Sequence, residues 1–364
     1  INGVPENPTA WLYTVAKNKT RDYFKRISIF EKQIKHNLYT GGHEQAKNIA
    51  FDEQIISDSQ LAMIFAVCNP INSGESQTCL ALQILCGFSI EEIANAFLAN
   101  PETIKKRLHR ARANLRNDNF QIKSLSETEI KVRLDTVLKT LYLLFNEGYF
   151  SKTNNSFIRK DLCSEAVRLT LLLTENPLTD SSETNALLAM MCFQSSRLDA
   201  RANAKGEAVL FDEQDKNLWD KSLIQRGNYY LVNATGSKGI SKYHLEAGIA
   251  YWHTTSADEN KWQHILQLYN QLTFLEYSPI TALNRTFAFA KVYGYEKAIS
   301  EAEKLNLPEN SQYCQLLGYL YSQSDIFKAI QHYEMAIKLT KSLTEKETLK
   351  KEIERLKMYK KPVF

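Results

Sequence analysis

The sequence has few residues that break helices and no long apolar run. Only 13 of its 364 residues are glycine and 8 are proline, which leaves little room for disordered or low-complexity tracts. No apolar stretch approaches the roughly 18 to 20 residues that span a bilayer. The N-terminus also lacks the basic and then apolar layout of a signal peptide. We therefore expect a folded, cytoplasmic protein that has no membrane partner.

Residues with metal-binding spacing are also lacking. The six cysteines form no C-x-x-C pair, and they fall in apolar stretches where reduced, buried thiols are expected. His244, His253 and His264 are separated by 9 and 11 residues, which matches no common metal spacing. We interpret these histidines as packing or helix-face residues. The sequence thus predicts neither a metal site nor a cofactor.

Long stretches rich in Leu, Ala, Lys and Glu, with few alternating Val/Ile/Thr runs, favour an all-α fold. The length of 364 residues favours two or three domains, and a hydrophobic content of 44% is sufficient for their cores. The formal net charge is only +4. A surface for nucleic acid would therefore have to come from local clustering of positive charge.

Such a cluster lies in PETIKKRLHRARANLR, residues 101–116, where six side chains are Lys or Arg and one is Glu. Three helices are expected in this region: one at 76–86, one capped by Ser89 with Glu92 completing a capping box, and one beginning at Pro101. The third helix has a buried stripe of four apolar residues at helical spacing: Ile104, Leu108, Ala111 and Leu115. Two short helices with a tight turn between them, the second one basic, are typical of a helix-turn-helix.

A basic helix face is often only a solvated surface, and that interpretation has to be weighed here. A solvated helix usually alternates Glu with Lys, whereas this helix has a single acid, so its like charges repel one another unless a polyanion neutralises them. The outward side chains of this helix fall into two groups according to the part of DNA that each could contact. Thr103, Lys106 and Arg110 are placed to meet base edges, and Lys105, Arg107 and Arg112 are better suited to phosphates.

Residues 1–27 read as a further basic helix, with Asn7 as its N-cap and Pro8 at its first position. Residues 28–70 are expected to form a linker with one or two short helices. Residues 118–364 form a helical extension, whose part at about 280–340 resembles tetratricopeptide repeats. The residues that fit the repeat are Leu317, Gly318 and Tyr321 in its first helix and Ala329, Tyr333 and Ala336 in its second.

The carboxylate-rich segment at residues 197–220 does not favour an enzymatic function. Residues 197–220 contain several Asp, Glu and Arg side chains, and paired carboxylates can perform acid/base chemistry. The same segment offers no nucleophile, metal pattern or phosphate loop. We interpret it as a structural ion-pair network in a connector, and we expect no catalytic residue.

The segment at 87–116, GFSIEEIANAFLANPETIKKRLHRARANLR, resembles region 4 of bacterial RNA polymerase sigma factors of the extracytoplasmic-function (ECF) group. Residues 8–26, PTAWLYTVAKNKTRDYFKR, are similar to the region 2.4 helix of that family. The remainder resembles the helical extension of the ECF subgroup that has a tetratricopeptide-like C-terminal domain. By this resemblance, 1–27 is a remnant of region 2, 28–70 a linker, 71–117 region 4 and 118–364 the extension. The earlier part of region 2 is absent, so we expect the chain to be a fragment.

The resemblance implies a sigma factor that directs core RNA polymerase to promoter DNA. The helix from Pro101 would read the minus-35 element through Thr103, Lys105, Lys106, Arg107, Arg110 and Arg112. The N-terminal helix would lie near the minus-10 element through Lys17, Asn18 and Arg21. The C-terminal domain would regulate activity through a peptide, protein or small-molecule signal.

Two other classes of function remain open from the sequence. One is a one-piece helix-turn-helix transcriptional regulator whose helical-repeat domain binds a ligand or a protein. The other is a scaffold whose basic helix binds an acidic protein partner. The helix at 1–27 disfavours the first, because a one-piece regulator has no need of it.

Overall fold

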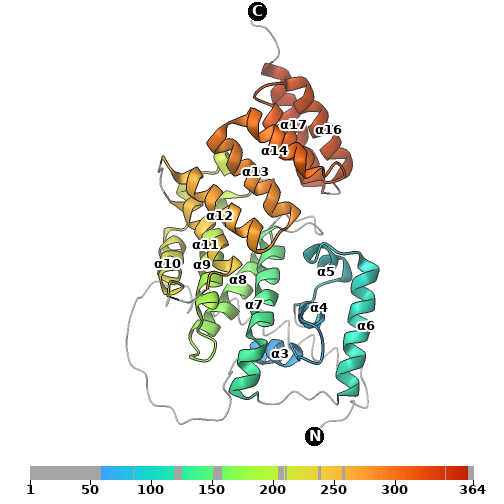
Figure 1. The fold of residues 1–364 in the computed structure, drawn as a ribbon, viewed down its shortest axis with the longest axis vertical. Helices are drawn as coiled ribbons and strands as arrows, with labels where there is room; N and C mark the ends of the chain where they lie inside the picture. The colour runs from blue at the N-terminus through green and yellow to red at the C-terminus, as the bar shows by residue number, and fades with distance from the viewer. Residues whose placement is uncertain are drawn as a thin grey trace, which may run out of the picture. The chain divides into compact units, whose positions relative to one another are not determined.

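The computed structural model describes residues 59–84, 86–118, 125–150, 158–203, 209, 211–236, 239–255, 259–340 and 342–359. The helix predicted at 1–27, with Lys17, Asn18 and Arg21, lies outside the described residues, as does the predicted linker up to residue 58. The chain divides into units Ile1–Glu53 and Gln54–Phe364, and all described residues belong to the second. Their helices and the absence of β-strands among them confirm the all-α fold (Figure 1). None of the helices in these ranges is both long enough and apolar enough to cross a membrane.

The first four described helices are α3 (Ser59–Val67), α4 (Gly74–Ile84), α5 (Ile90–Ala96) and α6 (Pro101–Asn117) (Figure 1). The three helices predicted between residues 72 and 115 are all present, and the first begins two residues before its predicted start at Ser76. Helix α3 lies in the segment predicted as a linker. Its Ile64 and Phe65 are completely buried, so the last part of that segment belongs to the folded core.

Helix α7 (Glu127–Tyr149) packs against α3, α4 and α5, and it also contacts α8 (Lys160–Thr174) and α9 (Ser182–Ser195). Arg133 of α7 donates hydrogen bonds to the carbonyl oxygens of Phe65 (3.0 Å) and Ala66 (3.3 Å), near the end of α3. These bonds satisfy carbonyl groups that have no partner within their own helix. One continuous apolar core extends from α3 through α9 to residues of α11, which ends at Thr254.

The connector after α9 contains three short 3₁₀ helices, η2 (Leu198–Ala200), η3 (Phe211–Glu213) and η4 (Lys216–Leu218). Helices α10 (Lys221–Asn233) and α11 (Lys242–Thr254) then pack on α9. Helix α9 is buried around its whole circumference, with eight successive buried residues from Ala186 to Phe193. A helix that is apolar all round is expected at the centre of a layered helical domain.

The last six helices are α12 (Lys261–Leu275), α13 (Pro279–Tyr293), α14 (Tyr295–Leu305), α15 (Ser311–Tyr321), α16 (Ile326–Leu339) and α17 (Leu343–Tyr359). Helices α13 and α14 form one hairpin and α15 and α16 the next, each with a short turn, as the repeat pattern predicts. Ala329 and Ala336 are completely buried. A Cβ atom added at Gly318 would lie 2.6 Å from the ring of Tyr333, so the small residue permits close approach of α15 and α16.

We predict that Gly318→Ala destabilises the protein by about 1–3 kcal/mol, because the added methyl group overlaps the Tyr333 ring in a packed core. Chemical denaturation followed by circular dichroism measures the change. Gly74→Ala is the matched control, since its Cβ atom would meet only Thr136 Oγ1 at 3.9 Å and alanine favours the helix. Equal stability of the two variants would contradict the close-packing account.

Glu246 of α11 has a partly buried carboxyl group on the side that contacts α7. Tyr142 donates a hydrogen bond to Glu246 Oε1 at 2.8 Å, and Lys242 Nζ lies 3.0 Å from Glu276 Oε2. Burial raises the pKa of Glu246 to about 7, although the Tyr142 hydrogen bond and the Lys242 charge act in the opposite direction. The folded protein therefore holds this proton more tightly than the unfolded chain does.

Ionisation of Glu246 should make the protein less stable as the pH rises. This loss of stability is absent below the ordinary pKa of 4.5 and is complete once the pH is above the pKa of about 7 in the folded protein. Glu246→Gln keeps an oxygen for Tyr142 and cannot ionise. We predict that this variant gains stability relative to the wild type between pH 5 and pH 8, in urea denaturation at each pH. A constant difference across that range would contradict the assignment.

Candidate nucleic-acid interface

Local hydrogen bonds fix the starts of α5 and α6. Ser89 N donates to Glu92 Oε2 at 2.7 Å and Glu92 N donates to Ser89 Oγ at 3.1 Å, which confirms the predicted capping box. Leu98 in the turn adopts a left-handed conformation, with φ of +50°. Asn100 then caps α6 by accepting a hydrogen bond from Glu102 N at 2.8 Å. These caps fix the direction in which α6 leaves the turn.

Helix α6 is held along one side by apolar packing and near its C-terminus by amide groups. The predicted stripe of Ile104, Leu108, Ala111 and Leu115 is buried. Asn72 Nδ2 donates to the carbonyl oxygen of Ala111 at 3.2 Å, and Asn114 Nδ2 donates to Asn72 Oδ1 at 3.0 Å. The rotation of α6 about its axis is therefore set, and so is the face that it presents to solvent.

The outward face of α6 has more positive charge than the described acids neutralise. The exposed polar and charged side chains on this face include Thr103, Lys105, Lys106, His109, Arg110, Arg112 and Arg116. Lys105 lies 3.8 Å from Glu102, and both side chains are well exposed. Lys106 and Arg110 have no ion-pair partner within the described ranges. This face is therefore suited to bind a polyanion.

Two of the predicted phosphate contacts are already engaged within the protein. Arg107 forms an ion pair with Glu75 of α4 at 2.6 Å, and its guanidinium group lies 5.8 Å from the Phe97 ring centroid. Arg112 donates a hydrogen bond to Gln83. Glu75 and Gln83 belong to another helix, and only tertiary packing brings them to α6. Arg107 thus positions α6 against α4, whereas Lys106 and Arg110 form no ion pair with any described residue.

An ion pair that could not be foreseen from the sequence links the capping box to the C-terminal helices. Arg159, the residue before α8, places Nη1 2.8 Å from Glu92 Oε1. Glu92 is 9% exposed, and its other carboxylate oxygen accepts from the Ser89 backbone. The Glu92 side chain therefore caps the start of α5 and also joins α5 to the start of α8.

We predict that Glu92→Gln and Arg159→Gln are coupled by about 1 kcal/mol in a double-mutant cycle, because each single change leaves a partly buried partner without its ion pair. Denaturation of the wild type, both single variants and the double variant gives the coupling. The Glu92→Gln side chain retains an oxygen for the Ser89 backbone, so the cap is preserved. Strictly additive changes would show that the ion pair contributes nothing to the attachment of α5.

The carboxylates at residues 197–220 serve structural purposes where the structure describes them. Asp199 pairs with Lys160, and Asp212 lies 3.4 Å from Lys291 Nζ. Asp215 caps η4 and Asp220 caps α10. These contacts agree with the interpretation of the segment as a structural network.

The six cysteines carry free thiols, and five of them are buried. Burial raises the pKa of the thiols of Cys68, Cys163 and Cys192 to about 12, so these side chains stay protonated and are poor nucleophiles. Within the described ranges, no group of three His, Cys, Asp or Glu side chains is arranged to hold a metal ion. We assign no chemistry to these residues.

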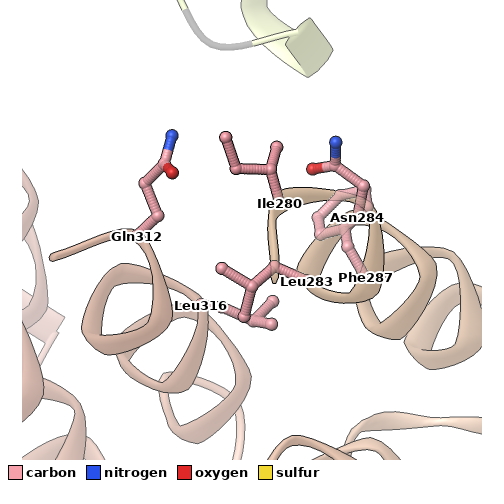
Figure 2. Close-up of a pocket in the computed structure, with 6 residues that line it drawn as sticks. All are labelled: Ile280, Leu283, Asn284, Phe287, Gln312 and Leu316. Atoms are coloured by element: carbon pink, nitrogen blue, oxygen red, sulfur yellow. The ribbon is translucent and has the colours of Figure 1, made fainter. Parts of the chain in front are cut away.

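A small pocket lies between α13 and α15, the first helices of the two hairpins. Figure 2 shows the amide groups of Asn284 and Gln312 on opposite sides of Ile280, with Leu283 and Leu316 beneath them. Its volume is about 140 Å³, whereas pockets for drug-sized ligands have about 300–1,000 Å³. The pocket has room for one side chain of a partner.

Comparison with known proteins places residues 133–235, from α7 to the end of α10, in a family described as "Family of unknown function (DUF6596)". The chain is 31% identical over 323 residues to "Uncharacterized protein R00370" of Rhizobium meliloti (strain 1021), with 88% of this chain and 74% of the relative aligned. No solved structure matches the chain. The alignment with the relative is long enough to include regions on both sides of 133–235.

Proposed function

This chain belongs to the protein family of the Rhizobium meliloti relative, and we propose that it is a sigma factor that brings bacterial RNA polymerase to specific promoters. In this proposal, α5 and α6 form the helix-turn-helix of region 4. Helix α6 enters the major groove of the minus-35 element. The C-terminal helices regulate that activity.

The observation that carries the proposal is that Lys106 and Arg110 have no ion-pair partner among the described residues and lie on the outward face of α6. Its apolar face and its caps fix the helix, so these charges point away from the core. Like charges four residues apart on a helix repel each other and destabilise it. The negative charge of DNA would offset that repulsion, and the release of its counterions gives DNA binding a strong dependence on salt.

Each side chain on the outward face of α6 is assigned to the part of DNA that it could contact. Thr103, Lys106 and Arg110 are proposed to contact base edges, and Lys105 and Arg112 to contact phosphates. Arg107 instead supports α6 from the side through Glu75. Lys17, Asn18 and Arg21 are proposed to lie near the minus-10 element, as the resemblance of residues 8–26 to region 2.4 implies.

We predict that the triple variant Lys105→Ala, Lys106→Ala, Arg110→Ala loses most of its affinity for duplex DNA. Each lost phosphate contact should also reduce the slope of log K against log salt by about 0.9. Fluorescence anisotropy of the whole chain on labelled duplex DNA from upstream of its own gene, at several salt concentrations, measures both quantities.

The matched control is Lys297→Ala, Lys338→Ala, Lys357→Ala, which removes three exposed lysines from α14, α16 and α17. Both triple variants lower the net charge by the same amount, so a general charge effect would weaken them equally. The proposal expects the control to bind like the wild type. Equal affinity of all three proteins would overturn the assignment of α6.

Co-purification with core RNA polymerase distinguishes the classes of function. A sigma factor must bind the polymerase, whereas a one-piece regulator needs only its operator. A scaffold for an acidic protein would bind neither polymerase nor duplex DNA. Retention of polymerase by the immobilised protein, and also by the α6 triple variant, would support the sigma factor and separate polymerase binding from promoter reading.

A further inference from the structure

Six side chains from the α9–α10 connector and from α11 and α12 form a basic–aromatic cluster, which consists of Arg197, Phe211, Trp219, His253, Lys261 and Trp262. The Arg197 guanidinium group lies 4.6 Å from the Phe211 ring centroid and 5.7 Å from that of Trp219. Lys261 Nζ lies 5.8 Å from the Phe211 centroid. The rings of Phe211 and His253 are 4.9 Å apart between centroids, and those of His253 and Trp262 are 5.7 Å apart.

Cations outnumber acids around this cluster. Burial lowers the pKa of Lys261, and the positive charges of Lys216 and Arg197 lower it further. The acid that offsets them is Asp212, which is 64% exposed and lies 3.4 Å from another cation, Lys291 Nζ. Burial and the positive charges of Arg197 and Lys261 lower the pKa of His253 to about 3, so this ring stays neutral and adds no charge. The cluster keeps an excess of positive charge in a partly buried place.

Four polar atoms in and beside the cluster are buried and have no hydrogen-bond partner in the described part of the chain: Arg197 Nε, Gln214 Oε1, Trp219 Nε1 and His253 Nδ1. Gln214 and Trp219 are each only 8% exposed. Buried polar groups in folded proteins are almost always satisfied, so several unsatisfied groups in one place indicate a missing water, ion or ligand. Two of the four atoms, on Arg197 and Trp219, are N–H donors.

We propose that the basic–aromatic cluster binds a small anionic molecule that presents a carboxylate or a phosphate group to Arg197, Lys261 and the Trp219 N–H group. An anion would satisfy both free donors and balance the crowded cations, whereas a cation would add to the repulsion. Ordered water would satisfy the donors but leave the charge unbalanced. Arg197 covers one face of Phe211 and one face of Trp219, so the proposed recognition rests on the anionic group.

This site does not depend on the proposed promoter-binding function, because it lies in the C-terminal helices and involves no residue of α6. A failure of DNA binding would leave the site intact, and a failure of anion binding would leave the role of α6 intact.

The test is titration of the full chain with inorganic phosphate and, separately, with acetate, at constant ionic strength maintained with chloride. Trp219 and Trp262 make intrinsic fluorescence a direct readout, and thermal unfolding gives a second one, since a ligand that binds the folded state raises the unfolding temperature. We expect saturable binding of at least one anion at concentrations up to tens of millimolar.

Lys261→Gln should weaken that binding by about tenfold or more, which corresponds to the loss of one charge-assisted contact. Trp219→Phe keeps a ring in place and removes the N–H group, so it should weaken binding several-fold. Lys297→Gln, on the exposed side of α14, is the control with the same charge change and should bind like the wild type. Circular dichroism confirms that each variant is folded.

Three results would overturn the proposal. One is the absence of saturation for both anions in the wild type, which would indicate that water alone occupies the cluster. The second is equal weakening by Lys261→Gln and Lys297→Gln, which would indicate a general charge effect. The third is unchanged binding in both Lys261→Gln and Trp219→Phe.

Discussion

Burial of both sides of α7 is the constraint on which the rest of the structure depends. One side covers α3, α4 and α5, and the other covers α8 and α9, so that a single apolar core connects α5 and α6 to α8, α9 and α11. Arg133 and the Glu92–Arg159 ion pair reinforce this connection with polar contacts. Removal of residues 126–364 would therefore expose the apolar core of α3 to α6. Such a deletion would disturb the fold of these helices as well as remove the C-terminal helices.

The basic residues of α6 have different roles because their surroundings differ. Arg107 faces α4 and forms an ion pair with Glu75, which holds α6 in place. Arg112 is exposed and donates a hydrogen bond to Gln83 of the same helix α4. Lys106 and Arg110 face solvent without a partner in the described part of the chain. A charge count along the sequence cannot distinguish these two groups. Because Arg107 is paired with Glu75, five of the six side chains predicted from the sequence remain as proposed contacts to DNA.

The features that could be predicted from the sequence are those that depend on neighbouring residues. The capping box at Ser89, the start of α6 at Pro101 and the buried stripe of α6 follow from local hydrogen bonding and helical spacing. Gly318 and Tyr333 were assigned to the two helices of the repeat from its fixed spacing, and the structure places them in close contact. The burial of α3 and the partners of Arg107 and Glu92 could not be predicted, because they join residues far apart in the chain. The basic–aromatic cluster was missed for the same reason, since its members come from three separate segments.

Run-off transcription tests the proposal that α6 binds promoter DNA in a complex with RNA polymerase. The assay uses core RNA polymerase, the full-length protein and DNA from upstream of its own gene. We expect a discrete transcript that requires the protein and disappears with Lys105→Ala, Lys106→Ala, Arg110→Ala. The control variant Lys297→Ala, Lys338→Ala, Lys357→Ala should give the same transcript as the wild type. A transcript of equal strength with the α6 variant, or none with the wild type bound to polymerase, would contradict the account.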